Sequence, residues 1–142
     1  MLKTSVLYRI AAVLMVFFAA GHTLGFRLTD PSLGVGPVVS LMQTIHFGMQ
    51  GFSRSYWDLY VGFGFLTSVF LLFAAVLAWQ LGGMTADVLR RMRGITWGLA
   101  ACFAAVSFLS WRYFFTLPIA FSIVITGCLA AAARVSEKPR LP

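Results

Sequence analysis

The chain has 142 residues, of which 60% are hydrophobic and 11% are charged, and its mean hydropathy is +0.88. These values exclude a water-soluble globular domain of this size, because so many apolar side chains cannot be buried in one small core. The composition predicts a single integral membrane domain over residues 1–142, with the lipid bilayer as its main partner.

The net charge is +7, yet the basic residues lie at the ends of apolar runs instead of forming one solvated basic face. This distribution argues against nucleic acid as a partner. The two cysteines, Cys102 and Cys128, lie inside apolar runs without a CxxC motif or a neighbouring histidine. The sequence therefore predicts no metal site.

Four apolar runs are long enough, at about 1.5 Å per residue, to cross a hydrocarbon core of roughly 30 Å. They cover residues 6–26, 57–81, 95–115 and 117–135. The first run also resembles a secretory signal with a small-residue cleavage site, but we predict that it is retained as a span. The predicted fold is all-α: a four-helix transmembrane bundle with a short outer-face amphipathic helix between spans 1 and 2.

That additional helix is predicted over residues 37–50. Apolar residues at helical spacing form one stripe: Val38, Met42, Ile45 and Met49. A neighbouring stripe is polar: Gln43, His46 and Gln50. This pattern predicts an amphipathic helix that lies at the membrane surface or dips back into the bundle, with its apolar stripe buried.

The distribution of Lys and Arg predicts the orientation. Eight of the 11 basic residues fall on the side of the two termini, and only Arg27, Arg54 and Arg112 fall on the other side. By the positive-inside rule, both termini are cytoplasmic and residues 27–56 face outward. The same bias argues against an antiparallel dimer of dual topology.

Polar residues gather near the outer ends of the first two spans. His22 ends the first span, and Asp58 opens the second. We predict that these two side chains are in contact, because an ionisable group in a membrane needs a partner, and they could act as a catalytic acid–base pair. The alternative is structural: Asp58 stabilises the first helical turn and pairs with Arg54, while Ser55 is the N-cap.

The predicted ligand-binding set extends this pair along the outer face. Its members are His22, Gln43, His46, Arg54, Tyr56, Trp57 and Asp58. The cofactor is unknown, with haem b and a quinone as the two possibilities considered. A haem would require His22 and His46 to face each other across the bundle.

Residues 20–26 (AGHTLGF) and 54–64 (RSYWDLYVGFG) resemble segments of small, uncharacterised bacterial four-span membrane proteins, and the layout resembles the DoxX-like group. That resemblance implies an accessory or quinone-linked role in a membrane redox system. It assigns no catalytic residue to this chain.

Three functions follow from these patterns. The first is an accessory or binding protein with an outer-face pocket for a lipid-soluble molecule, such as a quinone, or for a partner subunit or second copy. The second is a membrane enzyme that uses His22 and Asp58. The third is a small transporter, although no Asp or Glu lies at the centre of any span.

Overall fold

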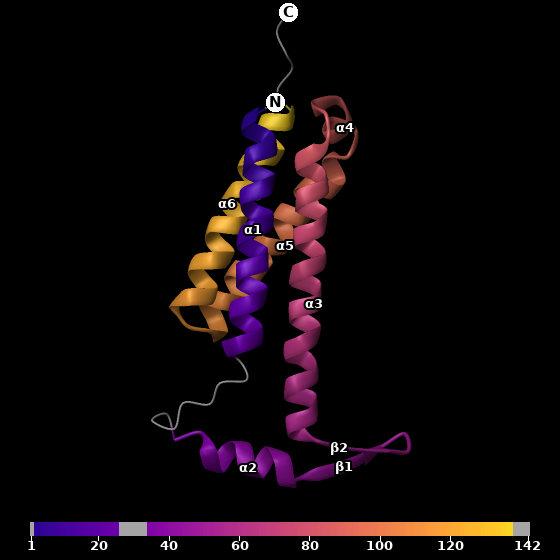
Figure 1. The fold of residues 1–142 in the computed structure, drawn as a ribbon, viewed down its shortest axis with the longest axis vertical. Helices are drawn as coiled ribbons and strands as arrows, with labels where there is room; N and C mark the ends of the chain where they lie inside the picture. Colours follow the sequence, from indigo (N-terminus) through magenta and orange to yellow (C-terminus); the bar gives the residue numbers. More distant parts are fainter. Residues whose placement is uncertain (1, 26–33, 138–142) are drawn as a thin grey trace, which may run out of the picture. The chain divides into compact units, whose positions relative to one another are not determined.

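The computed structural model describes residues 2–25 and 34–137, and these ranges contain six helices and one β-hairpin (Figure 1). In chain order the elements are α1 (Leu2–Gly25), α2 (Gly36–Thr44), β1 (His46–Met49), β2 (Phe52–Ser55), α3 (Tyr56–Gly83), α4 (Ala86–Arg91), α5 (Arg93–Tyr113) and α6 (Thr116–Glu137).

Four of the helices, α1, α3, α5 and α6, are long and apolar enough to cross a membrane. Their large apolar side chains are mostly exposed; Phe63 and Phe70 on α3, for example, expose 66% and 62% of their surfaces. Such side chains are stable on the outside of a helix only where lipid is the solvent. The predicted all-α fold with four apolar helices in a bundle is confirmed.

The described chain divides into two compact units. Unit 1 consists of residues 1–18 and 71–142, and unit 2 consists of residues 19–70. The helices α1 and α3 each contribute one part to both units.

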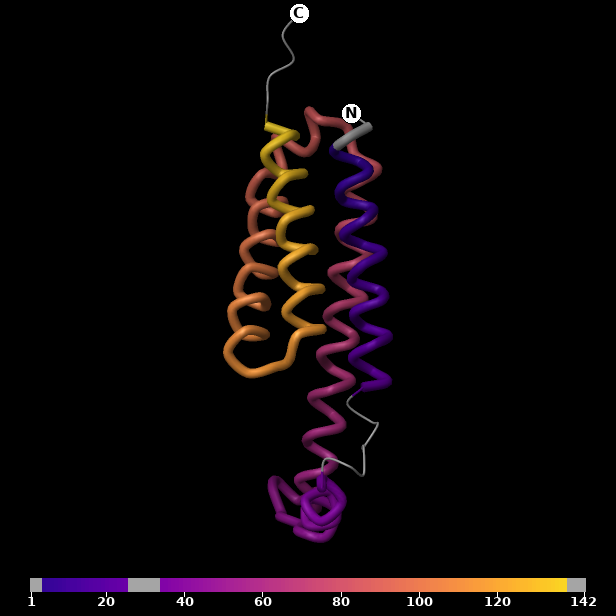
Figure 2. Tube along the Cα trace, turned by 90° about the vertical axis from the view of Figure 1, so that its left-hand side faces the viewer, coloured from indigo at the N-terminus to yellow at the C-terminus, as the bar shows by residue number. Residues whose placement is uncertain are grey.

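In unit 1, α5 and α6 lie side by side as an antiparallel pair joined by a short turn (Figure 2). Ser107 Oγ and Thr126 Oγ1 are 3.1 Å apart across this pair, and Trp97 Nε1 donates to Glu137 Oε1 at 2.8 Å. The buried residues of both helices are mostly small, among them Ala100, Ala132 and Ala133. Small side chains allow the two backbones to approach closely, as is typical of membrane helices.

The same unit contains a close crossing of α1 and α3. Ser5 Oγ donates to the carbonyl oxygen of Gly82, and Tyr8 is fully buried beside it. A Cβ atom added to Gly82 would lie 3.2 Å from the backbone carbonyl oxygen of Ser5 and 3.3 Å from Tyr8 Cβ. A side chain at this position would press on α1, so the glycine suits the close packing of the two helices.

Unit 2 contains the last turns of α1, then α2, the hairpin and the first half of α3. Thr23 Oγ1 of α1 and Ser68 Oγ of α3 are 2.7 Å apart, and each hydroxyl also lies within hydrogen-bond distance of a carbonyl in its own helix. Helix α2 begins with Pro37 in its first turn and has no buried residue.

The helix predicted over residues 37–50 is correct only in its first part. Residues 46–49 form β1, which pairs with β2 in the register His46↔Ser55 and Met49↔Phe52. The turn residues Gln50 and Gly51 have φ values of 52° and 85°, the left-handed pair that suits a two-residue hairpin. The apolar stripe does not pack into the protein, since Val38 and Ile45 are about half exposed, and its burial at the membrane surface stays a prediction.

Candidate functional site

The candidate site is built where the hairpin meets α3. Ser55 is the last residue of β2 and directly precedes the helix. Its hydroxyl oxygen accepts from the backbone N–H of Asp58 at 3.1 Å, and the Asp58 carboxylate accepts from the backbone N–H of Ser55 at 2.8 Å. This reciprocal pair is a capping box, with Asp in the place of the more usual Glu. The structural alternative for Asp58 as a helix cap is therefore confirmed.

Two cationic or potentially cationic side chains surround that carboxylate. Arg54 and His46 are both near enough to interact electrostatically with Asp58. Arg54 makes no ion pair with Asp58 within the described residues; its guanidinium donates to the carbonyl oxygen of Ser53 and lies 5.3 Å from the Phe52 ring centre. His46 Nδ1 lies 3.0 Å from the carbonyl oxygen of Thr44, so Nδ1 is the protonated nitrogen when this bond forms.

The hairpin gathers its three large apolar side chains, together with Arg54, on one face. Residues opposite each other in an antiparallel pair share one face. One face of the hairpin therefore carries Phe47, Met49, Phe52 and Arg54, and the other carries His46, Gly48, Ser53 and Ser55. The apolar face is largely uncovered, because Met49 and Phe52 expose 63% and 62% of their surfaces.

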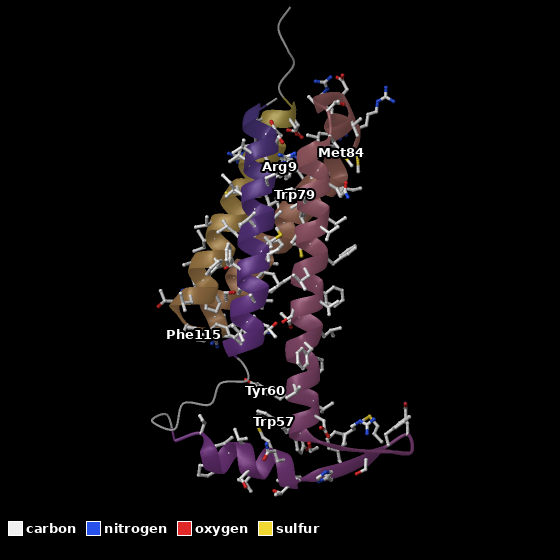
Figure 3. The ribbon with its side chains drawn as sticks, in the orientation of Figure 1. Arg9, Trp57, Tyr60, Trp79, Met84 and Phe115 are labelled. Carbon is white, nitrogen blue, oxygen red and sulfur yellow. The ribbon has the colours of Figure 1, made fainter. Side chains whose placement is uncertain are left out.

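Aromatic rings continue this apolar surface onto α3. The rings of Phe47 and Tyr56 are 5.3 Å apart, and those of Trp57 and Tyr60 are stacked at 5.4 Å. Figure 3 labels Trp57 and Tyr60 on the first turns of α3, directly after the hairpin. We call residues 36–60 the platform, which comprises α2, the hairpin and these turns.

His22 does not belong to this cluster. It is half-buried in the last turn of α1, next to Thr23, which is level with Ser68 of α3. Asp58 precedes Ser68 by about 15 Å along the helix, at about 1.5 Å per residue. That distance is too long for direct contact or for one bridging water. The predicted His22–Asp58 contact is therefore wrong, because α3 continues well beyond the end of α1.

The same geometry bears on the haem hypothesis. His46 lies opposite Ser55 in the hairpin. Ser55 is about 20 Å along α3 from Ser68, which lies at the level of His22. The two histidines therefore do not meet at one site. In residues 2–25 and 34–137 there is also no cluster of three or more His, Cys, Asp or Glu side chains that could hold a metal ion.

Of the predicted ligand-binding set, the structure brings together five members and places His22 apart from them. The group comprises His46, Arg54, Tyr56, Trp57 and Asp58. Gln43 is exposed on α2, and His22 lies at the level of Ser68. The hairpin was missed, although alternating apolar residues on both sides of Gln50 and Gly51 are its sequence signal.

No protein-family model matches this chain, and neither the curated proteins nor the solved structures include a match to it.

Proposed function

We propose that the protein is an accessory protein of a bacterial inner membrane and that its platform binds a partner membrane subunit. One observation carries this proposal. Eight apolar side chains of the platform each expose at least 41% of their surface: Val38, Leu41, Ile45, Met49, Phe52, Tyr56, Leu59 and Tyr60. A group of exposed apolar side chains next to polar groups is typical of an interaction site.

The orientation is part of the proposal. We place the platform on the outer side and the two termini in the cytoplasm, because the basic residues are distributed eight to three in favour of the terminal side. A partner that binds the platform would then contact it at the outer membrane surface. An accessory role agrees with what the DoxX-like resemblance implies.

A lipid-soluble ring compound, such as a quinone, is the second candidate for the platform. The stacked rings of Trp57 and Tyr60 favour it, since aromatic faces bind flat rings, and Asp58 lies between these two residues in sequence. The geometry does not support the enzyme hypothesis, which depends on contact between His22 and Asp58. His22 lies at the level of Ser68, and Asp58 is about 15 Å from Ser68 along α3. The transporter hypothesis gains no support from the described residues.

Photo-crosslinking in native membranes tests the proposal. The photoreactive residue p-benzoylphenylalanine is placed at Phe52, on the apolar hairpin face, and at Ser53 as the matched control on the opposite face. We expect irradiation to yield one discrete adduct at position 52 and none at position 53. Mass spectrometry of the adduct then identifies its chemistry.

Each result has a defined meaning. An adduct with one other membrane protein supports the partner subunit, and an excess of the unmodified chain should reduce it. An adduct of twice the chain mass indicates a second copy instead, and a small aromatic adduct indicates the quinone-like ligand. Equal labelling of bulk phospholipid at both positions overturns the proposal, because the platform would then be an ordinary lipid-exposed surface.

A further inference from the structure

Arg9 is a permanently charged side chain inside a membrane-spanning segment. The apolar span of α1 begins at Thr4, so Arg9 lies about 7.5 Å inside it along the helix. A guanidinium at such a position is unfavourable unless it has a partner or reaches the headgroup region. The surroundings of Arg9 therefore indicate what it binds.

Within unit 1 the guanidinium stacks on an aromatic ring. Arg9 Cζ lies 5.2 Å from the ring centre of Trp79 on α3, and Figure 3 shows the two labelled residues next to each other. This cation–π contact stabilises the charge without neutralising it. No carboxylate of the described residues pairs with Arg9, because the one ion pair among them joins Arg90 and Asp87. The donors of the guanidinium fork can therefore take an anion from outside the chain.

An open apolar groove of about 310 Å³ lies on the face of α1 that carries Arg9. Arg9 supplies its one charged group, and the other lining residues also come from α1: Val6, Ile10, Val13 and Leu14. Since these residues recur every three or four positions, the groove runs along the helix past Arg9, and its longer part lies towards the middle of the span. Its apolar lining beside a single charge suits a hydrocarbon chain that extends from a charged group.

Among the described residues at this end of unit 1, basic side chains outnumber the acidic ones, Asp87 and Glu137. Arg90, Arg91, Arg93 and Arg134 lie at the same end of unit 1, where α1 and α5 begin and α3 and α6 end. Trp79 is half exposed there, as is typical of an aromatic residue at the headgroup level. This end of the unit therefore attracts anionic headgroups.

We propose that Arg9 and Trp79 form a binding site for one anionic phospholipid. The lipid phosphate accepts hydrogen bonds from the Arg9 guanidinium, which Trp79 holds in position, and one acyl chain lies along Ile10, Val13 and Leu14. The ligand is a lipid rather than free phosphate, because the groove beside the charge is apolar. This site is independent of the platform.

Native mass spectrometry of the detergent-purified full chain tests the site, with phosphatidylglycerol and phosphatidylcholine as the lipids. We expect preferential retention of phosphatidylglycerol, and we expect Arg9→Gln to weaken it by about tenfold, as for the loss of a charge-assisted hydrogen bond. Arg112→Gln is the matched control. It removes the same charge from an arginine that also stacks on an aromatic ring, Tyr113, at 5.2 Å, and it should leave binding unchanged.

A second variant tests the groove without touching the charge. Val13→Trp fills the path of the acyl chain on an exposed helix face, so it should also weaken phosphatidylglycerol binding while the far-ultraviolet circular dichroism is unchanged. Millimolar inorganic phosphate should not displace the lipid. If Arg9→Gln and Arg112→Gln weakened phosphatidylglycerol binding equally, the result would contradict a specific site. Unchanged phosphatidylglycerol binding in both Arg9→Gln and Val13→Trp would also contradict it. Displacement by phosphate would show an anion site without a lipid groove.

Discussion

The hydroxyl groups of Thr23 and Ser68 lie 2.7 Å apart, on α1 and α3 respectively, and this contact marks the level at which the two helices meet in unit 2. Ser68 is almost completely buried, with 6% of its surface exposed. On the hairpin side of this contact, α1 ends at Gly25, whereas α3 extends as far as its first residue, Tyr56. The first turns of α3 therefore extend about 15 Å beyond the end of α1.

This interhelical hydrogen bond should contribute measurably to stability. We expect Thr23→Val and Ser68→Ala each to lower the free energy of unfolding by about 1 kcal/mol. Because the two hydroxyls bond to each other, the double variant should lose clearly less than the sum. Thermal melts of the four proteins in detergent provide the cycle. Strictly additive losses would mean that the two hydroxyls are not coupled.

The capping box at the start of α3 gives a second expectation. Ser55→Ala should lower the free energy of unfolding by about 1 kcal/mol, since it removes the N-cap hydroxyl. Asp58→Asn should be non-additive with Ser55→Ala but additive with His22→Ala, because Asp58 contacts Ser55 and lies far from His22. Thermal melts distinguish the two cases. Coupling between His22 and Asp58 would restore the acid–base pair.

The crossing of α1 and α3 in unit 1 should tolerate no side chain at Gly82. Gly82→Leu should cost about 1–3 kcal/mol, because the new Cβ would already be 3.2 Å from the backbone carbonyl oxygen of Ser5. Gly83→Leu is the matched control, since nothing lies within 4 Å of a Cβ at that position. Its effect should stay within about 0.5 kcal/mol. Similar losses of unfolding free energy in both variants would contradict the close crossing.

The hairpin turn depends on the left-handed backbone of Gly51. Gly51→Val should open the turn, because a β-branched residue is strained at a φ of 85°, whereas Gln50→Gly should be tolerated or stabilising. Amide hydrogen exchange of residues 46–55 measures the outcome. We expect faster exchange in Gly51→Val only. Equal protection in both variants would indicate that pairing with β2 does not require this turn.

The proposed orientation can be measured with an impermeant thiol reagent in intact cells. In a background of Cys102→Ala and Cys128→Ala, a cysteine at Ser53 should react, because we propose that the platform faces outward. A cysteine at Thr85, in the turn between α3 and α4, should react only after permeabilisation. Both positions are exposed. The reverse pattern would invert the topology.

The spans could be predicted because each is a long apolar run, and length alone is sufficient for that inference. The relative depth of residues on different spans could not be predicted, since no pattern in the sequence indicates which residue of α3 lies beside the end of α1. His22 and Asp58 were therefore assigned to one level. The hairpin was missed for a different reason: Met42, Ile45 and Met49 have helical spacing, while Phe47 and Met49 also alternate as in a strand. Pairing with β2, which is not local, decides between the two.

The length of α3 has a consequence for its behaviour in bilayers of different thickness. Its 28 residues make a rod of about 42 Å, whereas a hydrocarbon core measures roughly 30 Å. The excess of about 12 Å must be accommodated by tilt or by projection into the headgroup region and the water beyond. Because the hairpin and the rod are joined directly at Ser55, a change in bilayer thickness alters the height at which the platform meets its surroundings. The length of α3 thus links the lipid composition of the membrane to the position of the platform.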